Sequence, residues 1–325
     1  MAGILVIAEA AGTGVTRESL ETASLAMRLA AAMQQPVCGA LLGAGDLANA
    51  AAQFQCGFSA LLLVESPQLA TYVAQQYVAA VQSLIAKVQP AVVLFPHTAK
   101  SRDWAPRLAA KIGSGLVLDC VNVTVEQEGV TASKPMYGGG VLAKLVVHGD
   151  PALVSVRAGI FECAQLSSGG AVERMELPQL AAHPGIQHLE SISIEGAGGQ
   201  RLKDAKTIIS GGRGIGEKDN WHFIVEAAAA LGAAVGCSRP VADAGWVSSS
   251  SQVGLSGALV APDIYIAVGI SGAIQHLAGI SSAKTVIAIN NDPEADIFKR
   301  ADYGVVDDFK EVLPAFVERI KQLRS

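Results

Sequence analysis

Short apolar runs alternate with segments of helical periodicity along the first hundred residues. The apolar runs have the length of buried strands and lie at 3–8, 37–42, 60–64 and 91–95. The segments between them carry apolar residues three to four positions apart, as helices do, at 17–33, 72–88 and 103–112. Apolar strands that alternate with helices are typical of a parallel sheet covered on both faces. The pattern therefore predicts an N-terminal parallel α/β domain.

The pattern changes between residues 115 and 161, where short strand-like runs alternate with glycine-rich turns. The run 121–125 alternates apolar and polar side chains, as a half-buried antiparallel strand does. We interpret this stretch as a β-rich extension of the first domain, which we place at 1–194. The following residues, 195–206, begin with EGAGGQ and lack periodicity, so they are predicted to be a linker.

Alternation of strands and helices resumes after the linker. Strands are predicted at 207–209, 233–235, 264–268, 285–289 and 303–306, and helices at 221–231, from residue 273 and at 309–323. These elements define a second domain, 207–325, with a doubly wound, Rossmann-like parallel sheet. The chain is therefore expected to be a two-domain α/β protein, as its 325 residues also suggest.

Composition narrows the class of protein. A formal net charge of −5 argues against a nucleic-acid binder, and no apolar run reaches the roughly 18 residues of a membrane span. The chain enters its first strand without a basic leader, so we expect a cytoplasmic protein, or a mitochondrial matrix protein if a presequence has been removed. Neither the cysteines nor the histidines lie at metal-ligand spacing, and no metal site is predicted.

A glycine-rich loop at 269–272 is the first candidate for binding chemistry, since it joins an apolar strand to a short helix that begins at Ala273. Open parallel sheets bind ligands at the carboxyl ends of their strands. Glycine lets the backbone approach a phosphate, the Ser271 hydroxyl can donate a hydrogen bond, and a helix N-terminus favours an anion. An ordinary tight turn is the alternative interpretation.

Two arginines follow other strands of the second domain. The loop 210–216 contains Arg213, which could clamp a phosphate, although its glycines do not form a GxGxxG fingerprint. Arg239 follows the strand predicted at 233–235. It either pairs with Asp243 or is directed at a ligand.

A loop at 252–257 adds the hydroxyl of Ser256. A serine hydrolase is rejected as an interpretation, because neither GISG at 269–272 nor GLSG at 254–257 is a GxSxG nucleophile motif.

Taken together, the motifs of the second domain closely resemble the α subunit of electron-transfer flavoproteins. The segments that carry the resemblance are SGGRG at 210–214, VGCSR at 235–239, DAGW at 243–246, QVGLSG at 252–257, YIAVGISGAIQHLAG at 265–279, AINNDPEA at 288–295 and ADYG at 301–304. The first domain resembles the family more loosely, through ILVIAE at 4–9 and APRLA at 105–109.

The resemblance implies FAD held mainly by the second domain. It also implies a heterodimer, in which a β subunit that carries AMP or a second FAD contacts the first domain. Carried over by position, the FAD-binding residues would be Arg213, Ser238, Arg239, Val253, Gly254, Leu255, Ser256, Ser271, Gly272, Ala273, Ile274, Gln275, His276, Asn290, Asp308 and Phe309.

The same resemblance implies individual roles. Arg239 would lie against the isoalloxazine ring, and the Ser256 hydroxyl would bond the N5 edge. His276 would lie near the C2 carbonyl, with Asn290 and Asp308 at the adenosine end. From the residues alone, a core-packed His276 and a structural Arg239 stay open.

This chain departs from the family at one notable place in that set. The family often has Gln-Thr where this sequence has Leu255 and Ser256. Serine keeps the hydroxyl, but leucine cannot make a polar contact.

The function implied is that of an electron carrier, without a catalytic acid, base or nucleophile. It would accept electrons from flavin dehydrogenases, such as the acyl-CoA dehydrogenases of fatty acid β-oxidation, and pass them to a quinone oxidoreductase or another acceptor. One alternative is the α subunit of an electron-bifurcating, NADH-dependent flavoprotein. The other is an NAD-dependent enzyme, although the sequence lacks a GxGxxG motif with its acidic ribose-binding residue.

Overall fold

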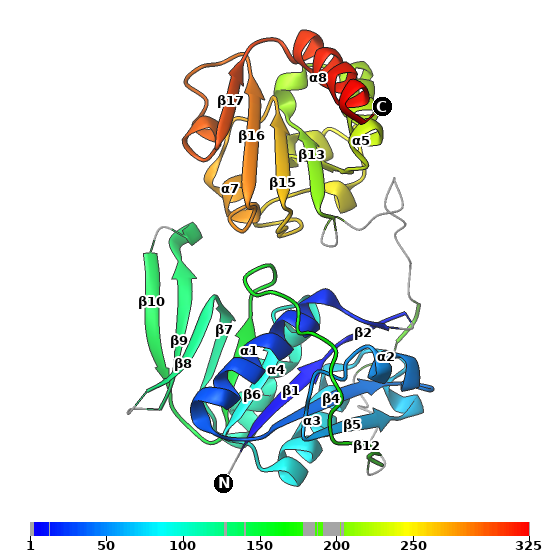
Figure 1. The fold of residues 1–325 in the computed structure, drawn as a ribbon, viewed down its shortest axis with the longest axis vertical. Helices are drawn as coiled ribbons and strands as arrows, with labels where there is room; N and C mark the ends of the chain where they lie inside the picture. The colour runs from blue at the N-terminus through cyan, green and yellow to red at the C-terminus, as the bar shows by residue number, and fades with distance from the viewer. Residues whose placement is uncertain are drawn as a thin grey trace. The chain divides into compact units, whose positions relative to one another are not determined.

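The computed structural model of the protein describes residues 3–12, 14–126, 129–139, 141–177, 186, 188–190, 202 and 205–324. The chain forms two compact units, 1–190 and 191–325, and each is described by itself (Figure 1). Both units are α/β, which confirms the predicted fold class. Of the predicted linker, 195–206, only Leu202, Ala205 and Lys206 are described, so the rest of it lies outside the described residues and the domain boundaries stay predictions.

A seven-stranded parallel sheet with the order β12-β5-β4-β1-β6-β11-β7 forms the centre of the first unit. Its strands are β1 (Ile4–Ala8), β4 (Val37–Gly43), β5 (Ala60–Glu65), β6 (Val92–Pro96), β7 (Leu116–Cys120), β11 (Ala152–Val156) and β12 (Ala171–Arg174). The central strands β1, β6 and β11 are buried at every position. Burial on both faces explains why their sequences are apolar without alternation.

Helices cover both faces of this sheet. α1 (Arg17–Met33) and α2 (Ala48–Ala52) pack into the core on one face, and α3 (Ala74–Val88) and α4 (Ala99–Ile112) into the core on the other. Helix α4 begins at Ala99 and not at residue 103 as predicted. The reason is a capping box, in which Thr98 and Ser101 each accept a hydrogen bond from the backbone N–H of the other.

Among the described residues, antiparallel strand pairing is confined to two small sheets. β8 (Asn122–Glu126), β9 (Gly129–Met136) and β10 (Val141–Val147) form a three-stranded sheet, and β2 (Ala10–Ala11) pairs with β3 (Gly14–Val15). Residues 115–161 are rich in strands, as predicted, and the first and last strands of this stretch, β7 and β11, belong to the parallel sheet. The three strands of the antiparallel sheet lie between β7 and β11 in the sequence, so no local pattern predicts that β7 and β11 pair.

The second unit has a five-stranded parallel sheet with the order β14-β13-β15-β16-β17. Its strands are β13 (Thr207–Gly211), β14 (Ala234–Cys237), β15 (Ile264–Val268), β16 (Thr285–Asn290) and β17 (Tyr303–Val306). The chain leaves β13 for β14 on one side and then crosses to β15 on the other. The strand order therefore reverses beside β13, and such switch points are where open α/β sheets bind ligands.

Within the described part of this unit, the sheet is accompanied by the α-helices α5 (Trp221–Leu231), α6 (Arg239–Asp243), α7 (Ile274–Gly279) and α8 (Phe309–Arg324). α5 and α8 pack together into the core on one face of the sheet, and the core on the other face contains Tyr265 from β15. Across the described ranges of both units, no helix is long and apolar enough to cross a membrane.

Candidate functional site

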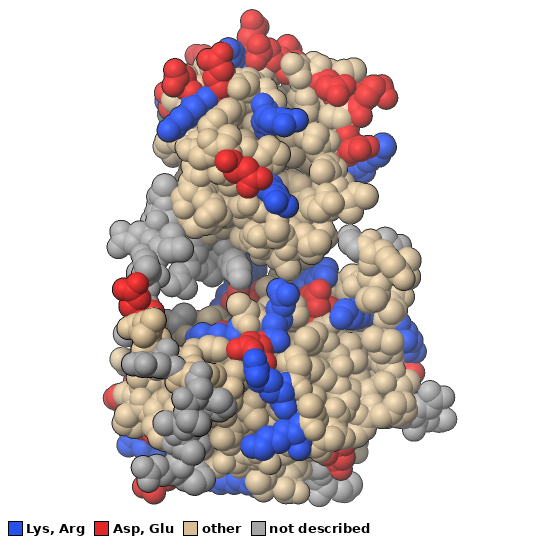
Figure 2. Space-filling model, turned by 180° about the vertical axis from the view of Figure 1, so that it is seen from behind, with Lys and Arg blue, Asp and Glu red and all other residues tan. Residues whose placement is uncertain are grey.

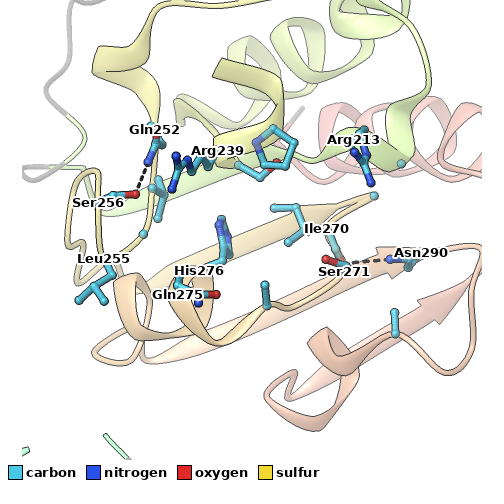
Figure 3. A pocket seen from close by; sticks show the side chains of 18 of the residues that line it. Arg213, Arg239, Gln252, Leu255, Ser256, Ile270, Ser271, Gln275, His276 and Asn290 are labelled. Carbon is cyan, nitrogen blue, oxygen red and sulfur yellow. Dashed lines mark hydrogen bonds between the residues drawn. The ribbon is translucent and has the colours of Figure 1, made fainter. Parts of the chain in front are cut away.

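A cavity of about 580 Å³ lies at the carboxyl ends of β14, β13, β15 and β16, beside the switch point. Most of the residues that the resemblance assigned to FAD line it: Arg213, Ser238, Arg239, Val253, Gly254, Leu255, Ser256, Ser271, Ala273, Gln275, His276 and Asn290. In Figure 3, Arg213, Arg239 and Gln252 lie on one side, and Ser271, Gln275 and His276 lie on the other.

A smaller cavity of about 260 Å³ adjoins the first and shares Gly214, Gly269 and Asn290 with it. Asp308 and Phe309, expected at the adenosine end, line this second cavity. The Phe309 side chain is buried in the core, and its ring meets that of Phe223 edge-on at 5.7 Å. The two adjoining cavities offer two connected compartments, which suits a dinucleotide.

Two residues of the expected set line neither cavity. Ile274 is 70% exposed on α7. Gly272 turns the loop against the next segment, where a Cβ would lie 2.1 Å from the backbone nitrogen of Ile297. The larger cavity also contains residues outside the expected set: Gly214, Pro240, Gln252, Gly269, Ile270, Asp292 and Ala295. All of these except Pro240 lie in motifs quoted for the resemblance, and those motifs are the signal that could have identified them.

The glycine loops that follow β13 and β15 are joined by hydrogen bonds between their backbone atoms. The N–H of Gly212 donates to Val268 O at 2.8 Å, and the N–H of Gly214 donates to Gly269 O at 2.9 Å. A Cβ on Gly212 would lie 2.2 Å from that Gly269 oxygen, which is too close for any side chain. Only glycine permits this approach, and the approach shapes the floor between the two cavities.

The helix that follows the loop is shorter than the anion-binding argument requires. α7 has six residues, and Ala273 precedes it without a side-chain cap. A helix of this length has a weak dipole, because the dipole is the sum of its aligned peptide units. The loop backbone and Arg213 are therefore the stronger candidates for attracting an anion in this cavity.

Arg239 pairs with Asp243, as one of the two interpretations made from the sequence expected, and its approach to a ligand stays a prediction. It begins α6, and its Nε lies 3.3 Å from Asp243 Oδ2, one helical turn away. The two side chains are 69% and 64% exposed, and such surface pairs contribute little, about 0–1 kcal/mol. Since Arg239 also lines the cavity, this weak pair leaves its positive charge available to a ligand.

Ser256 is positioned by a neighbour that the sequence did not single out. The Gln252 side-chain amide donates to Ser256 Oγ at 2.9 Å (Figure 3). Because the serine oxygen accepts this bond, its own proton stays available to a second acceptor. Leu255, the departure from the family pattern, is 64% exposed at the cavity wall.

His276 is the most buried polar side chain of the α7 wall. It is 6% exposed, and its Nε2 lies 2.9 Å from the hydroxyl of Tyr265. Burial lowers the pKa of His276 to about 4, against a smaller opposing effect of the Val253 backbone. The imidazole is therefore neutral at pH 7, and Arg213 and Arg239 supply the positive charge of the cavity.

Asn290 has a structural part in the site. Its Nδ2 donates to Ile270 O at 3.0 Å, and its Oδ1 accepts from the N–H of Asp292 at 3.0 Å. It thereby joins the loop after β15 to the loop after β16 at the point where the two cavities meet.

The cavity lining contains buried polar atoms that suit a polar cofactor. The Oγ of Ser238 and the Nδ1 of His276 are buried and make no hydrogen bond within the described residues. Both residues line the larger cavity. Buried polar atoms normally have partners, so this pair marks a place where a ligand completes the bonding.

Comparison with known proteins agrees with this geometry. Residues 4–180 match the electron transfer flavoprotein domain, and residues 201–281 match the electron transfer flavoprotein FAD-binding domain. The chain is 38% identical to the electron transfer flavoprotein subunit alpha of Bacillus subtilis, over 88% of each chain. It is 36% identical to the subunit alpha of Syntrophomonas wolfei, over 99% of this chain and all of that one. It is 34% identical to the lactate dehydrogenase (NAD(+),ferredoxin) subunit LctC of Acetobacterium woodii, over 93% of this chain and 73% of that one.

Fold, site and comparisons define an FAD-binding electron-transfer protein. The chain belongs to the electron transfer flavoprotein α-subunit family. The metal prediction concerned an absence, and among the described residues no group of three or more metal-ligating side chains is assembled.

Proposed function

We propose that this protein is the FAD-carrying subunit of a heterodimeric electron carrier. FAD lies along the two joined cavities of the second unit, with the flavin ring in the larger one and the adenosine end toward Asp308. The observation that carries this placement is the pair of unpartnered buried atoms, Ser238 Oγ and His276 Nδ1, in a cavity that two arginines line.

Bound FAD supplies the redox chemistry, and the protein supplies binding and electrostatics. Arg213 holds the pyrophosphate, since a guanidinium offers several donors to phosphate oxygens. Arg239 places a positive charge near the ring, which favours any form that gains negative charge. Ser256 donates its free proton at the N5 edge, and His276 acts as a neutral hydrogen-bonding group near the C2 carbonyl.

Replacing Ser238 with alanine tests this placement. We expect Ser238→Ala to weaken FAD binding about 5- to 10-fold, because the serine hydroxyl is a buried group that the cofactor pairs. Ser249→Ala, at an exposed serine of the same unit, is the matched control. Equal FAD affinity in the two variants would place the cofactor elsewhere.

The partner we propose is the electron transfer flavoprotein β subunit, which docks on the three-stranded sheet of the first unit. β10 is an edge strand, and Val141 and Leu142 on it are 54% and 61% exposed. Tyr137, just before that strand, is 85% exposed. Apolar side chains grouped on an edge strand mark an interaction surface.

A single substitution on β10 tests that surface. Leu142→Lys should abolish co-purification of the β subunit, while Leu323→Lys, at an exposed leucine of α8, should not. Co-purification that survives Leu142→Lys contradicts the proposed interface.

On the face shown in Figure 2, acidic and basic side chains occur on both units. This face is therefore not uniformly basic, as a nucleic-acid-binding face would be.

The electron donors that we propose are flavin dehydrogenases such as acyl-CoA dehydrogenases, and the acceptor is a quinone oxidoreductase. Residues 195–206 would act as a linker that lets the FAD unit turn toward each partner. A crosslink between the two units should slow electron transfer. An unchanged transfer rate would contradict the moving linker.

A bifurcating complex is the second candidate. It is favoured by the 34% identity to a subunit named for NAD(+) and ferredoxin together. Two FAD molecules per purified heterodimer would support it, and one FAD would support the simple carrier. Reduction of the purified complex by NADH is the second measurement that separates them.

A further inference from the structure

Tyr265 and His276 form a buried pair of aromatic side chains beside the larger cavity. Tyr265 is fully buried on β15, within the core on that face of the sheet. Its hydroxyl lies 2.9 Å from His276 Nε2, with the ring centroids 6.0 Å apart. Tyr265 lines neither cavity, whereas His276 lines the larger one. The tyrosine therefore contacts a residue of the cavity wall without lining the cavity itself.

The direction of this hydrogen bond follows from what each group can donate. Burial raises the pKa of Tyr265, so the phenol keeps its proton at neutral pH. A buried O–H requires an acceptor, and Nε2 of a neutral imidazole is one at 2.9 Å, while the Ser210 hydroxyl, which also interacts with the phenol, can donate to its oxygen. If the phenol donates to Nε2, the single proton of the neutral ring must be on Nδ1.

We propose that Tyr265 is a positioning residue of the FAD site, whose hydroxyl donates to Nε2 of His276 and so fixes the imidazole with its proton on Nδ1. His276 Nδ1 is the buried atom that has no partner among the described residues, so the proton sits on a nitrogen that makes no bond within them. In Figure 3, the His276 ring extends from α7 toward the side of the cavity with Arg239. A fixed tautomer keeps a hydrogen-bond donor on this wall without adding a third positive charge to the two arginines of the cavity.

This inference rests on the proposed function only for the identity of the ligand. The tautomer itself is a property of the full chain and is measurable without FAD. A failure of the FAD placement and a failure of the tautomer proposal therefore give different results.

The test is the protonation state of the His276 nitrogens in the ¹⁵N-labelled full chain, measured by two-bond ¹H–¹⁵N NMR at pH 7 with and without FAD. The His276 signals are identified by their loss in His276→Gln. We expect the proton on Nδ1 in the wild type. In Tyr265→Phe, which keeps the ring and removes only the oxygen, the form with the proton on Nε2 should become the major one.

Tyr303→Phe is the matched control, because it removes an exposed hydroxyl from the same sheet, and it should leave the His276 signals unchanged. A proton on Nε2 in the wild type overturns the proposal, even if the Tyr265→Phe variant fails to fold. An unchanged tautomer in a folded Tyr265→Phe variant overturns it as well.

The positioning role has a second readout in the protein with bound FAD. The reduction potential of the flavin should shift in Tyr265→Phe and stay unchanged in Tyr303→Phe. If the tautomer changes while both potentials equal that of the wild type, Tyr265 sets the histidine but has no influence on the cofactor. That result overturns the positioning role.

Discussion

Both parallel sheets of this protein have polar residues at the carboxyl ends of their strands, but these residues make different contacts in the two sheets. In the first unit these residues bond one another: His97 Nδ1 lies 2.8 Å from Ser155 Oγ, and Arg157 makes two hydrogen bonds of 2.8 and 2.6 Å with the carboxylate of Asp119. In the second unit, Ser238 Oγ and His276 Nδ1 have no partner within the described residues and line a large cavity. Polar groups that hydrogen-bond one another stabilise the fold. Buried polar groups that have no hydrogen-bond partner mark a place where a ligand can supply one.

The largest expected effect on stability and FAD binding comes from Gly212, where the backbones of two glycine loops of the second unit approach closely. Gly212→Ala places a Cβ against the Gly269 oxygen, so the unit should lose about 3 kcal/mol of unfolding free energy, and FAD binding with it. Urea unfolding and FAD content measure both effects. Gly232→Ala is the control, since that glycine has a φ of +66° and open space around it and should cost only about 1 kcal/mol. Similar losses in the two variants would show that the close approach does not matter.

The corresponding change in the first unit should affect stability alone. Asp119→Ala leaves the Arg157 guanidinium, which is 19% exposed, without its carboxylate. We expect a loss of about 2–3 kcal/mol of unfolding free energy in the first unit, because a mostly buried charge is left unpaired. FAD affinity should stay at the wild-type value. A fall in FAD affinity would mean that the two edges share a function.

The Asp119–Arg157 pair also predicts a pH dependence. Burial raises the pKa of Asp119, but the hydrogen bonds and charge of Arg157 outweigh it and hold that pKa below its ordinary value. A lowered folded-state pKa means that the stabilisation is complete above about pH 4 and is lost as the pH falls further. Unfolding free energy from pH 6 to pH 2.5 should decline less in Asp119→Asn than in the wild type. Parallel curves would contradict this assignment.

A smaller effect is expected for the charge beside the flavin. Arg239→Ala should lower the reduction potential of bound FAD by about 40 mV, equivalent to roughly 1 kcal/mol for an exposed unit charge near 4 Å. Asp243→Ala removes the ion-pair partner of Arg239 but keeps the positive charge, so the potential should stay equal or rise slightly. Redox titration of the two variants decides whether Arg239 is beside the ring.

The smallest effect is expected at Leu255, where the family often has glutamine. Leu255→Gln restores a polar side chain at the cavity wall and should strengthen FAD binding by at most about fivefold, about 1 kcal/mol. Because Leu255 is largely exposed, the unfolding free energy should not change. A clear fall in FAD affinity would show that the leucine packs on the cofactor.

Local sequence patterns predicted the features that depend on neighbours in the chain. The parallel strands, the glycine loops and the two arginines were found in this way, because strand periodicity and turn chemistry are local. The start of α4 was missed by a few residues, although the capping pair Thr98 and Ser101 is also local. Serine replaces the usual glutamate or glutamine of that motif.

Features that depend on contacts between distant segments could not be predicted. Tyr265 belongs to an apolar strand run and has the pattern of a core residue, and only the fold brings its hydroxyl to His276. Gln252 and Ser256 are only four residues apart, but the irregular loop that brings their side chains together has no periodic pattern from which the contact could be predicted. The membership of β7 and β11 in the parallel sheet likewise depends on long-range pairing.

Equilibrium binding of FAD to the full chain tests the contrast between the two sheet edges most directly. Arg213→Ala changes the edge of the second unit, and His97→Gln changes the edge of the first unit. The account predicts that Arg213→Ala weakens FAD binding about 10- to 100-fold, through the loss of charge-assisted hydrogen bonds to phosphate, and that His97→Gln leaves it unchanged. Weaker binding in His97→Gln together with unchanged binding in Arg213→Ala would contradict it.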